Sequence, residues 1–274
     1  FIYTIFLQTI CILGLYYIFK NLKYFAFKNI KSYLNNFFLE SGFLISIVVL
    51  LLFVSYFILS ITPVTDADSL DYHIGLPLYF LQNNDLIFNT DWKHSRVIGL
   101  GELLNLIGLK LKTDNISSVL NFISLIFLIS ILYKYDQDSK INNFLVIAII
   151  SIPMLLQLIP SQKPQFYGIC ALIIPILYAV RNDELKIYEN VFLLGSIFFA
   201  ISLKYSFYVS GLILIILFVI KFWRYKYLNL TICTIFYFIY LFPMHMLKYS
   251  NFGDPIAPMG NFFFDNGFAE EQMF

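Results

Sequence analysis

Charged residues are scarce in this sequence. Asp, Glu, Lys and Arg make up only 13% of the 274 residues, whereas soluble chains carry about 25%. Hydrophobic residues account for 59% of the chain, and its mean hydropathy is +0.77. These values exclude an ordinary soluble domain and predict an integral membrane protein.

Cysteine is also scarce, and the basic residues form no cluster. The three cysteines, Cys11, Cys170 and Cys233, lie inside apolar blocks, so they indicate neither a disulfide framework nor a zinc site. The net charge is only +1, and the Lys and Arg residues are scattered between the apolar blocks. The sequence therefore offers no basic patch for nucleic acid, which is not an expected partner.

The apolar residues form eight blocks, most of them near the roughly 20 helical residues that cross a ~30 Å hydrocarbon layer. The predicted spans are 1–20, 42–62, 116–133, 141–159, 165–180, 189–204, 206–222 and 228–247. The predicted fold class is all-α, a polytopic transmembrane helical bundle, with 1–274 as a single domain. Because the chain begins at Phe1 without an initiator Met and ends on a polar segment, both ends are expected to be truncated.

The distribution of basic residues predicts the orientation of these spans. Four gaps carry them, namely Lys20, Lys23, Lys28 and Lys31; Lys134 and Lys140; Arg181 and Lys186; and Lys221, Arg224 and Lys226. The positive-inside rule places all four gaps in the cytoplasm. A single helix over 189–222 would put Arg181 and Lys221 on opposite sides, so we expect two spans that turn near Lys204. By parity, 64–115 is an extracytoplasmic loop.

The outer loop opens with TDADSLDYHIGLPLYFLQNND at 65–85. Leu70, Ile74, Leu78 and Leu81 recur at helical spacing, which predicts an amphipathic helix over 69–83 at the membrane interface. Pro77 is expected to kink this helix. The apolar segment 97–111 is short for a span and is predicted to be a second juxtamembrane helix.

The acidic residues at the start of this loop have two interpretations. In the structural one, Asp68 caps the helix and Asp71 occupies its third position, where an acid complements the helix dipole. In the chemical one, the carboxylates act as a general base or hold a divalent cation beside a phosphate. A cap needs one side chain and does not call for Asp66 and His73, so the number of such groups favours chemistry.

A lipid-phosphate substrate would also need cationic partners, since a phosphate leaves water only when paired. Besides 64–115 and the turn at Lys204, the predicted outer segments are 160–165 and the stretch from Leu247 onward. With their immediate flanks they offer five candidates, which are Lys163, Lys204, Lys248, Arg96 and His245. Each of them alone is equally explained as a side chain that snorkels to the interface. Together with the acids they predict a site at the outer surface.

Three short motifs then connect the chain to a known family. The stretch TDADSLDYHIGLPLYFLQNN places Asp68, Tyr72, His73, Pro77, Leu81 and Asn83 in a first outer loop, LKYSFYVSGLILII begins a later span, and YSNFGDPIAPMGNFF follows the last. In order and spacing they resemble the GT-C superfamily of polyprenyl-phosphate-sugar-dependent glycosyltransferases, including the protein mannosyltransferase and lipid A aminoarabinose transferase branches. The resemblance covers about 42–264.

The resemblance implies that Asp68 is the catalytic base or a residue next to a metal ion, with Asp66 as its neighbour. We expect Asp68 to be the base, Asp66 and Asp71 to give electrostatic or metal support, and His73 to orient a hydrogen bond. The expected substrate-binding set is Lys163, Lys204, Lys248, Tyr72 and Arg96. The usual Asp-Glu pair is here Asp-Ala-Asp, and Gln165 stands where many members have an acid, so use of a divalent cation, Mg²⁺ or Mn²⁺, is left open.

The expected function is therefore transfer of a sugar from a polyprenyl-phosphate donor to a lipid-linked, glycan or protein acceptor. The expected location is a bacterial inner membrane, with the active site on the extracytoplasmic side. A transporter or flippase for a lipid-linked or small anionic substrate is the main alternative, and it predicts inverted repeats and ionisable groups near mid-membrane. A non-enzymatic membrane scaffold is a third interpretation, and it predicts no clustered loop chemistry.

Overall fold

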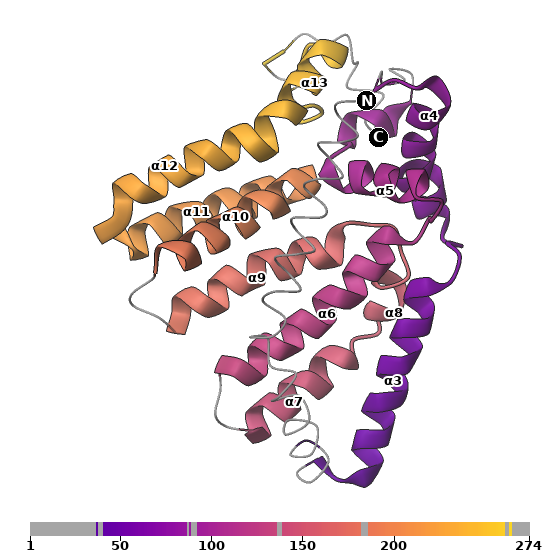
Figure 1. Cartoon of the computed structure of the whole chain (residues 1–274), viewed down its shortest axis with the longest axis vertical. Helices are drawn as coiled ribbons and strands as arrows, with labels where there is room; N and C mark the ends of the chain where they lie inside the picture. Colours follow the sequence, from indigo (N-terminus) through magenta and orange to yellow (C-terminus); the bar gives the residue numbers. More distant parts are fainter. Residues whose placement is uncertain are drawn as a thin grey trace.

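The computed structural model describes residues 41–86, 92–135, 139–181 and 186–260, together with Phe37, Phe88, Phe263 and Phe264. These residues are folded into helices and loops, without a strand among them (Figure 1). The α-helices are α3 (Phe43–Ile61), α4 (Gly75–Asn83), α5 (Leu100–Lys110), α6 (Ile116–Tyr135), α7 (Ser139–Ile150), α8 (Leu155–Leu158), α9 (Gln165–Arg181), α10 (Ile187–Leu203), α11 (Tyr208–Lys221), α12 (Lys226–Phe236) and α13 (Phe242–Phe252). The all-α prediction is confirmed for this part of the chain.

Shorter helical segments connect these elements. Two are π-helical, η1 (Ser69–Ile74) and η5 (Tyr237–Leu241), and three are 3₁₀, η2 (Lys93–Val97), η3 (Tyr205–Phe207) and η4 (Trp223–Tyr225). The predicted span 1–20, with Cys11 and Lys28, falls outside the described residues.

Several predicted boundaries agree closely with the structure. Helices α3, α6 and α9 coincide with predicted spans, and α5 is the short helix expected over 97–111. With 11 residues, α5 is about 16 Å long, too short to cross a bilayer. The predicted turn near Lys204 is also confirmed, because α10 ends at Leu203 and α11 begins at Tyr208.

Two predicted spans are wrong in detail. The block 141–159 is not one helix, since α7 ends at Ile150 and α8 has only 4 residues. Pro153 lies in the break, and a proline has no backbone N–H to continue a helical ladder. The predicted span 228–247 is instead part of a longer helical run, Trp223–Phe252, in which the π-helical η5 joins α12 to α13.

Two helical runs of the described residues are long and apolar enough to cross a membrane, Phe43–Ile61 and Trp223–Phe252. Their most apolar windows have mean hydropathies of 2.9 and 1.7, yet only 17% and 22% of those windows are buried within the protein. Five shorter apolar helices accompany them. The full set of eight spans stays a prediction.

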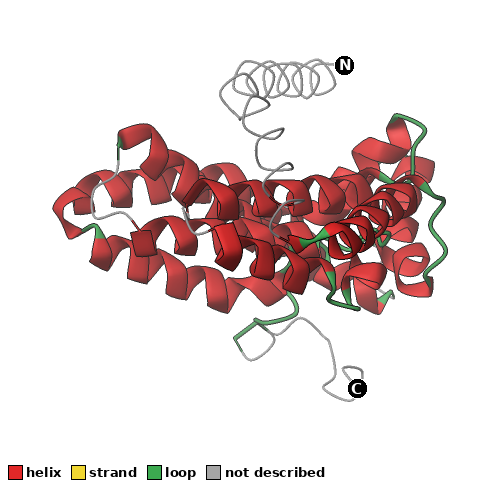
Figure 2. Ribbon diagram, turned by 90° about the horizontal axis from the view of Figure 1, so that it is seen from below, coloured by secondary structure: helices red, strands yellow, loops and turns green. Residues whose placement is uncertain are grey.

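The apolar core lies mainly along α10. Leu194, Ile197 and Leu203 of this helix are fully buried, and they pack with side chains of α9, α11 and α12. A second core joins α3, α6, α7 and α9 around Leu125 and Ile159. The helices form an elongated bundle (Figure 2). Within it, α10 contacts α5, α9, α11 and α12.

The predicted outer segments meet at one end of this bundle, where α4, α5 and α13 lie (Figure 1). The link from α13 to the first outer loop is a hydrogen bond in which Phe88 N donates to Asn251 Oδ1 at 3.1 Å. The C-terminal ends of α6, α9 and α11 lie away from this end. The segments predicted to be outer loops therefore lie together in the described part of the chain, and their side of the membrane stays a prediction.

Two glycines allow α5 to approach its neighbours at this end. A Cβ on Gly99 would lie 2.3 Å from the carbonyl oxygen of Leu203, and one on Gly101 would lie 2.5 Å from Pro164 Cγ. Real Cβ atoms do not come this close to backbone oxygen. Because glycine has no side chain, the start of α5 can pack against the end of α10 at Leu203, the residue before Lys204.

This contact predicts that Gly99→Ala destabilises the protein. Its Cβ meets a rigid carbonyl, so we expect a loss of about 1–3 kcal/mol, the usual effect of overpacking, and a lower thermal midpoint in detergent. Gly195→Ala is the matched control, because its Cβ would meet only the ring edge of Phe236 at 3.0 Å. Equal midpoints for the two variants would contradict a tight Gly99 contact.

Candidate functional site

The helix cap at the start of the outer loop is Asp66, not Asp68. Asp66 Oδ1 accepts a hydrogen bond from Ser69 N at 3.2 Å, whereas Asp68 already has helical backbone angles and makes no cap hydrogen bond. The structural interpretation of Asp68 is therefore wrong. Its carboxylate makes no cap hydrogen bond, and the side chain is 59% exposed.

The predicted helix 69–83 begins with the π-helical segment η1 rather than with a regular α-helical turn. Such turns are rare and often occur at functional sites. Pro77 lies just after it and has no N–H for the carbonyl oxygen four residues earlier, that of His73. That oxygen accepts a hydrogen bond from Asn105 Nδ2 of α5 at 2.9 Å. Because Pro77 offers no N–H to this oxygen, Asn105 can bind it and so connect the loop helix to α5.

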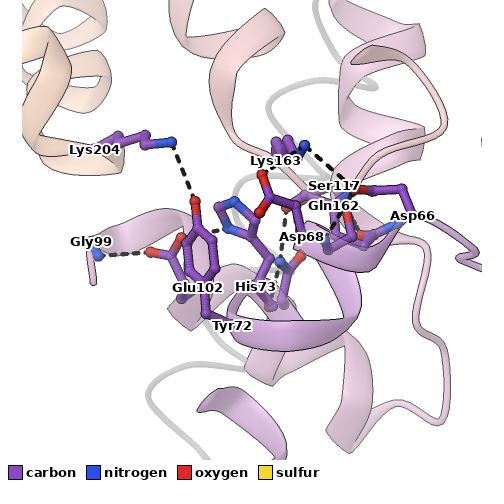
Figure 3. A network of polar contacts seen from close by, with 12 residues as sticks. Asp66, Asp68, Tyr72, His73, Gly99, Glu102, Ser117, Gln162, Lys163 and Lys204 are labelled. Carbon is purple, nitrogen blue, oxygen red and sulfur yellow. Dashed lines mark hydrogen bonds and ion pairs between the residues drawn. The ribbon is translucent and has the colours of Figure 1, made fainter. Parts of the chain in front are cut away.

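Lys163 joins the two acids at the start of the loop. Its Nζ lies 3.4 Å from Asp66 Oδ1 and 3.0 Å from Asp68 Oδ2 (Figure 3). The hydrogen bond from Lys163 lowers the pKa of Asp68 despite partial burial, and its positive charge adds to this effect. Burial raises the pKa of Asp66, but hydrogen bonds from Ser69 and the charge of Lys163 outweigh it, so the net shift is downward. We call Asp66, Asp68 and Lys163 the acid–lysine cluster.

The pKa of Lys163 moves in the opposite direction. Partial burial lowers it, but the hydrogen bond to Asp68 and the charges of both acids raise it above its ordinary value. All three members of the cluster are therefore held in their charged forms.

A buried polar network fixes the loop that carries Lys163. Gln162 is fully buried, and its backbone N donates to Ser69 Oγ at 2.9 Å. Its side-chain oxygen accepts from Ser117 N at 3.1 Å, and its carbonyl accepts from Asn105 Nδ2 at 3.1 Å. Lys163, the next residue, is thus held against the predicted first outer loop.

Asn121 of α6 anchors the same loop from the other side. Its Nδ2 donates to the carbonyl oxygens of Leu158 at 2.8 Å, Ser161 at 3.2 Å and Lys163 at 3.4 Å. Sequence reasoning missed Gln162 and its partners. A signal existed in the Ser and Asn residues at the start of the apolar block 116–133, which a lipid-facing helix would not need.

Lys204 and Tyr72 lie beside the acid–lysine cluster. Lys204 Nζ donates to Tyr72 Oη at 3.5 Å, a long hydrogen bond (Figure 3). Burial of Tyr72, followed by the negative charges of Glu102 and Asp68, raises the pKa of its hydroxyl, which keeps its proton. The expectation that Lys204 and Lys163 approach the acidic loop is confirmed.

The remaining predicted residues lie elsewhere. Asp71 is half exposed, and its Oδ2 lies 2.9 Å from His94 Nδ1 without hydrogen-bond geometry, so it gives the cluster no direct support. Lys248 is buried, and its Nζ donates to the carbonyl oxygens of Arg96 at 3.0 Å and Ala257 at 2.7 Å. Arg96 lies over the ring of Phe252, 5.0 Å from its centroid. Lys248 and Arg96 hold the 250–258 loop and do not join the acid–lysine cluster.

His73 has a partner that sequence reasoning missed. Its Nδ1 lies 2.7 Å from Glu102 Oε1, with both side chains buried. The other oxygen, Glu102 Oε2, accepts from Gly99 N at 2.7 Å and so closes the first turn of α5. The expected role of His73 as a hydrogen-bonding residue agrees with this pairing.

The described residues bring together no group of three or more His, Cys, Asp or Glu side chains that could hold a metal ion. Lys163 occupies the position between Asp66 and Asp68 that a divalent cation would take. The residues at this place thus fit an ammonium group and not Mg²⁺ or Mn²⁺.

One known protein family matches most of this chain. A family model described as the DUF1420 N-terminal domain matches residues 5–259. The chain belongs to this family. No curated protein and no solved structure matches it. The match includes every residue of the acid–lysine cluster and both members of the His73–Glu102 pair.

This DUF1420 N-terminal domain also has an apolar groove. Its volume is about 450 Å³, and side chains of α10, α11 and α12 line it. His245 of α13 is one of the lining residues, and its Nε2 lies 2.9 Å from the hydroxyl of Tyr208. His245, named above as a phosphate partner, is therefore placed at this groove and has a tyrosine partner.

Proposed function

We propose that this chain is a polytopic membrane glycosyltransferase of GT-C type that uses a polyprenyl-phosphate-sugar donor at the extracytoplasmic face. The observation that carries the proposal is the acid–lysine cluster. Two carboxylates and an ammonium group lie together at the end of the bundle where the outer loops meet, and a second lysine, Lys204, lies beside them. A base and two phosphate-binding cations are the groups that this reaction requires.

The exposed apolar surface supports a membrane location. Large hydrophobic side chains of α3, α11 and α12 face outward, including Phe43, Leu44, Val209, Ile216 and Leu230. A soluble monomer rarely exposes such continuous apolar surface, whereas lipid tails would cover it favourably. The charged cluster lies at the end of the bundle and not in its middle, which favours an interfacial enzyme over a transporter.

The proposed chemistry begins with the donor phosphate. An anionic phosphate would draw Lys163 away from Asp68 and would be held by Lys163 and Lys204. Asp68 would then lose the hydrogen bond and positive charge that lower its pKa, and it would become a stronger base toward the acceptor hydroxyl or amine. The donor tail would lie in the apolar groove between α10 and α12.

A labelling experiment tests the membrane topology. Single cysteines would be introduced as Asp71→Cys and Lys28→Cys in a chain without its three native cysteines. An impermeant thiol reagent added to intact cells is expected to label position 71 and not position 28, because the basic gaps face the cytoplasm. Labelling at 28 but not at 71 would overturn the orientation and the outer location of the site.

A further inference from the structure

The most unusual buried group near the site is the imidazole of His73. It is fully buried, its Nδ1 is held by Glu102, and its Nε2 has no hydrogen-bond partner. A buried polar atom without a partner destabilises the folded state, so its retention needs an explanation. The proposed function above uses Asp68 and Lys163 and leaves this nitrogen unused.

Glu102 determines which tautomer the ring takes. Its two oxygens lie near two nitrogen atoms, Oε1 near His73 Nδ1 and Oε2 near Gly99 N, which is a donor. A carboxylate in this position favours a proton on Nδ1, because Nδ1–H can donate to it. Nε2 then carries a lone pair, and the imidazole is ready to accept a proton there.

The π-helical segment brings His73 toward Asp68. These residues are five positions apart, and a π-turn pairs residues i and i+5, whereas in an α-helix they would point about 140° apart. The imidazole of His73 is among the groups whose electrostatic interaction lowers the pKa of Asp68, which agrees with this proximity. Tyr72 packs against the imidazole, with ring centroids 4.0 Å apart, and excludes solvent from it.

We infer that His73 and Glu102 form a proton relay that receives the proton taken up by Asp68. The inference rests on the proposed function and deepens it. Even after Lys163 has moved to the phosphate, a carboxyl ordinarily has a pKa of ~4 and an imidazole one of ~6.5, so the imidazole binds the proton more tightly. The relay would return Asp68 to its unprotonated form after each sugar transfer.

The relay completes the reaction as follows. The acceptor O–H gives its proton to the Asp68 carboxylate, while the acceptor oxygen forms a bond to the anomeric carbon of the donor sugar. The bond from that carbon to the phosphate oxygen breaks, and its electron pair leaves with the phosphate. Asp68 passes the proton to His73 Nε2, and the resulting imidazolium is stabilised by Glu102. The proton then returns through Asp68 to the released phosphate.

His73→Asn separates this role from a structural one. The amide nitrogen of Asn can occupy the place of Nδ1 and donate to Glu102, but Asn has no counterpart of Nε2. We expect an unchanged thermal midpoint and donor KM, with a fall in kcat of about 100-fold, within the range for losing acid–base catalysis. The control is Glu189→Gln, since Glu189 caps the first turn of α10, away from the site, and should change kcat less than twofold. A normal kcat in His73→Asn would overturn the relay.

The tautomer provides a readout that needs no transfer assay. The chain has only three histidines, so ¹⁵N-histidine NMR of the protein in lipid nanodiscs should resolve each ring, with His→Asn variants giving the assignments. We expect His73 to carry its proton on Nδ1 and a lone pair on Nε2, and Glu102→Gln to mix the tautomers. A proton on Nε2 with a bare Nδ1 would overturn the relay. Absence of sugar transfer by the wild-type protein would instead count against the proposed function.

Discussion

Asp68→Asn is expected to lower the rate of sugar transfer by about 100-fold or more, the usual range for loss of a general base, while the protein stays folded. Asp68 makes no cap hydrogen bond, and its side chain is 59% exposed, so the amide replaces it without loss of a buried contact. The measurement is transfer from a polyprenyl-phosphate-sugar donor in reconstituted vesicles, together with a thermal midpoint.

Two parallel variants serve as controls. Asp66→Asn keeps the helix cap, because Asn caps about as well as Asp, but removes one charge beside Lys163. Asp71→Asn disrupts only the exposed contact with His94. We expect an intermediate loss of rate in the first and little change in the second. Wild-type transfer in all three variants would leave the acidic loop as a cap and a solvated surface, and would remove the glycosyltransferase mechanism.

The sequence was sufficient to predict most of the helices. Long apolar blocks and the basic gaps between them predicted α3, α6, α9 and the turn at Lys204, because these features depend on local composition. The number of spans between the outer segments also predicted that these segments lie on the same side. Local composition did not predict the break at Pro153, where one proline interrupts an otherwise apolar block.

The contents of the site were harder to predict because its pairs are distant in the sequence. His73 and Glu102 are 29 residues apart, and Ser69 and Gln162 are 93 apart. Glu102 follows Gly99 by three residues, so in sequence it looks like an ordinary capping acid, a role that one of its oxygens indeed has. The other oxygen, Oε1, contacts His73, which is distant in the sequence, and no local sequence pattern predicts that contact.

The cap itself was assigned two residues too late. The first helical turn begins at Ala67, so the capping side chain is Asp66. Three acids within six residues each suit a helix start, and only the tertiary position of Lys163 distinguishes among them. The π-turn after Asp68 likewise depends on docking to Asn105 and not on a propensity of its own residues.

The charges of the acid–lysine cluster have a definite pH dependence. The pKa values of both acids are lowered, so their contribution to stability is complete above the ordinary range of a carboxyl and is lost as pH falls through the lowered values. The pKa of Lys163 is raised, so its contribution is complete below about 10.5 and is lost as pH rises through the raised value. Between these limits, around neutral pH, the cluster remains fully ionised.

Lys163→Ala is expected to weaken binding of a polyprenyl phosphate roughly 10- to 100-fold, which corresponds to the about 1.5–3 kcal/mol of a hydrogen bond to a charged group. The backbone of Lys163 is held by the buried loop beside Gln162, which positions its ammonium group at the two acids. The same variant leaves Asp66 and Asp68 without their shared counter-ion. Their pKa values should rise, and the acid limb of the stability profile should move to higher pH.

Binding would be measured by titration of polyprenyl phosphate into the protein in nanodiscs. Lys163→Arg should keep most of the affinity because it keeps the charge, although the guanidinium differs in shape from the ammonium group. Lys226→Ala is the matched control, since Lys226 lies over the Trp223 ring at the start of α12, away from the cluster. Unchanged affinity in Lys163→Ala, with the stability profile shifted as expected, would restrict Lys163 to pairing with the two acids. The donor phosphate would then have to be held by other groups.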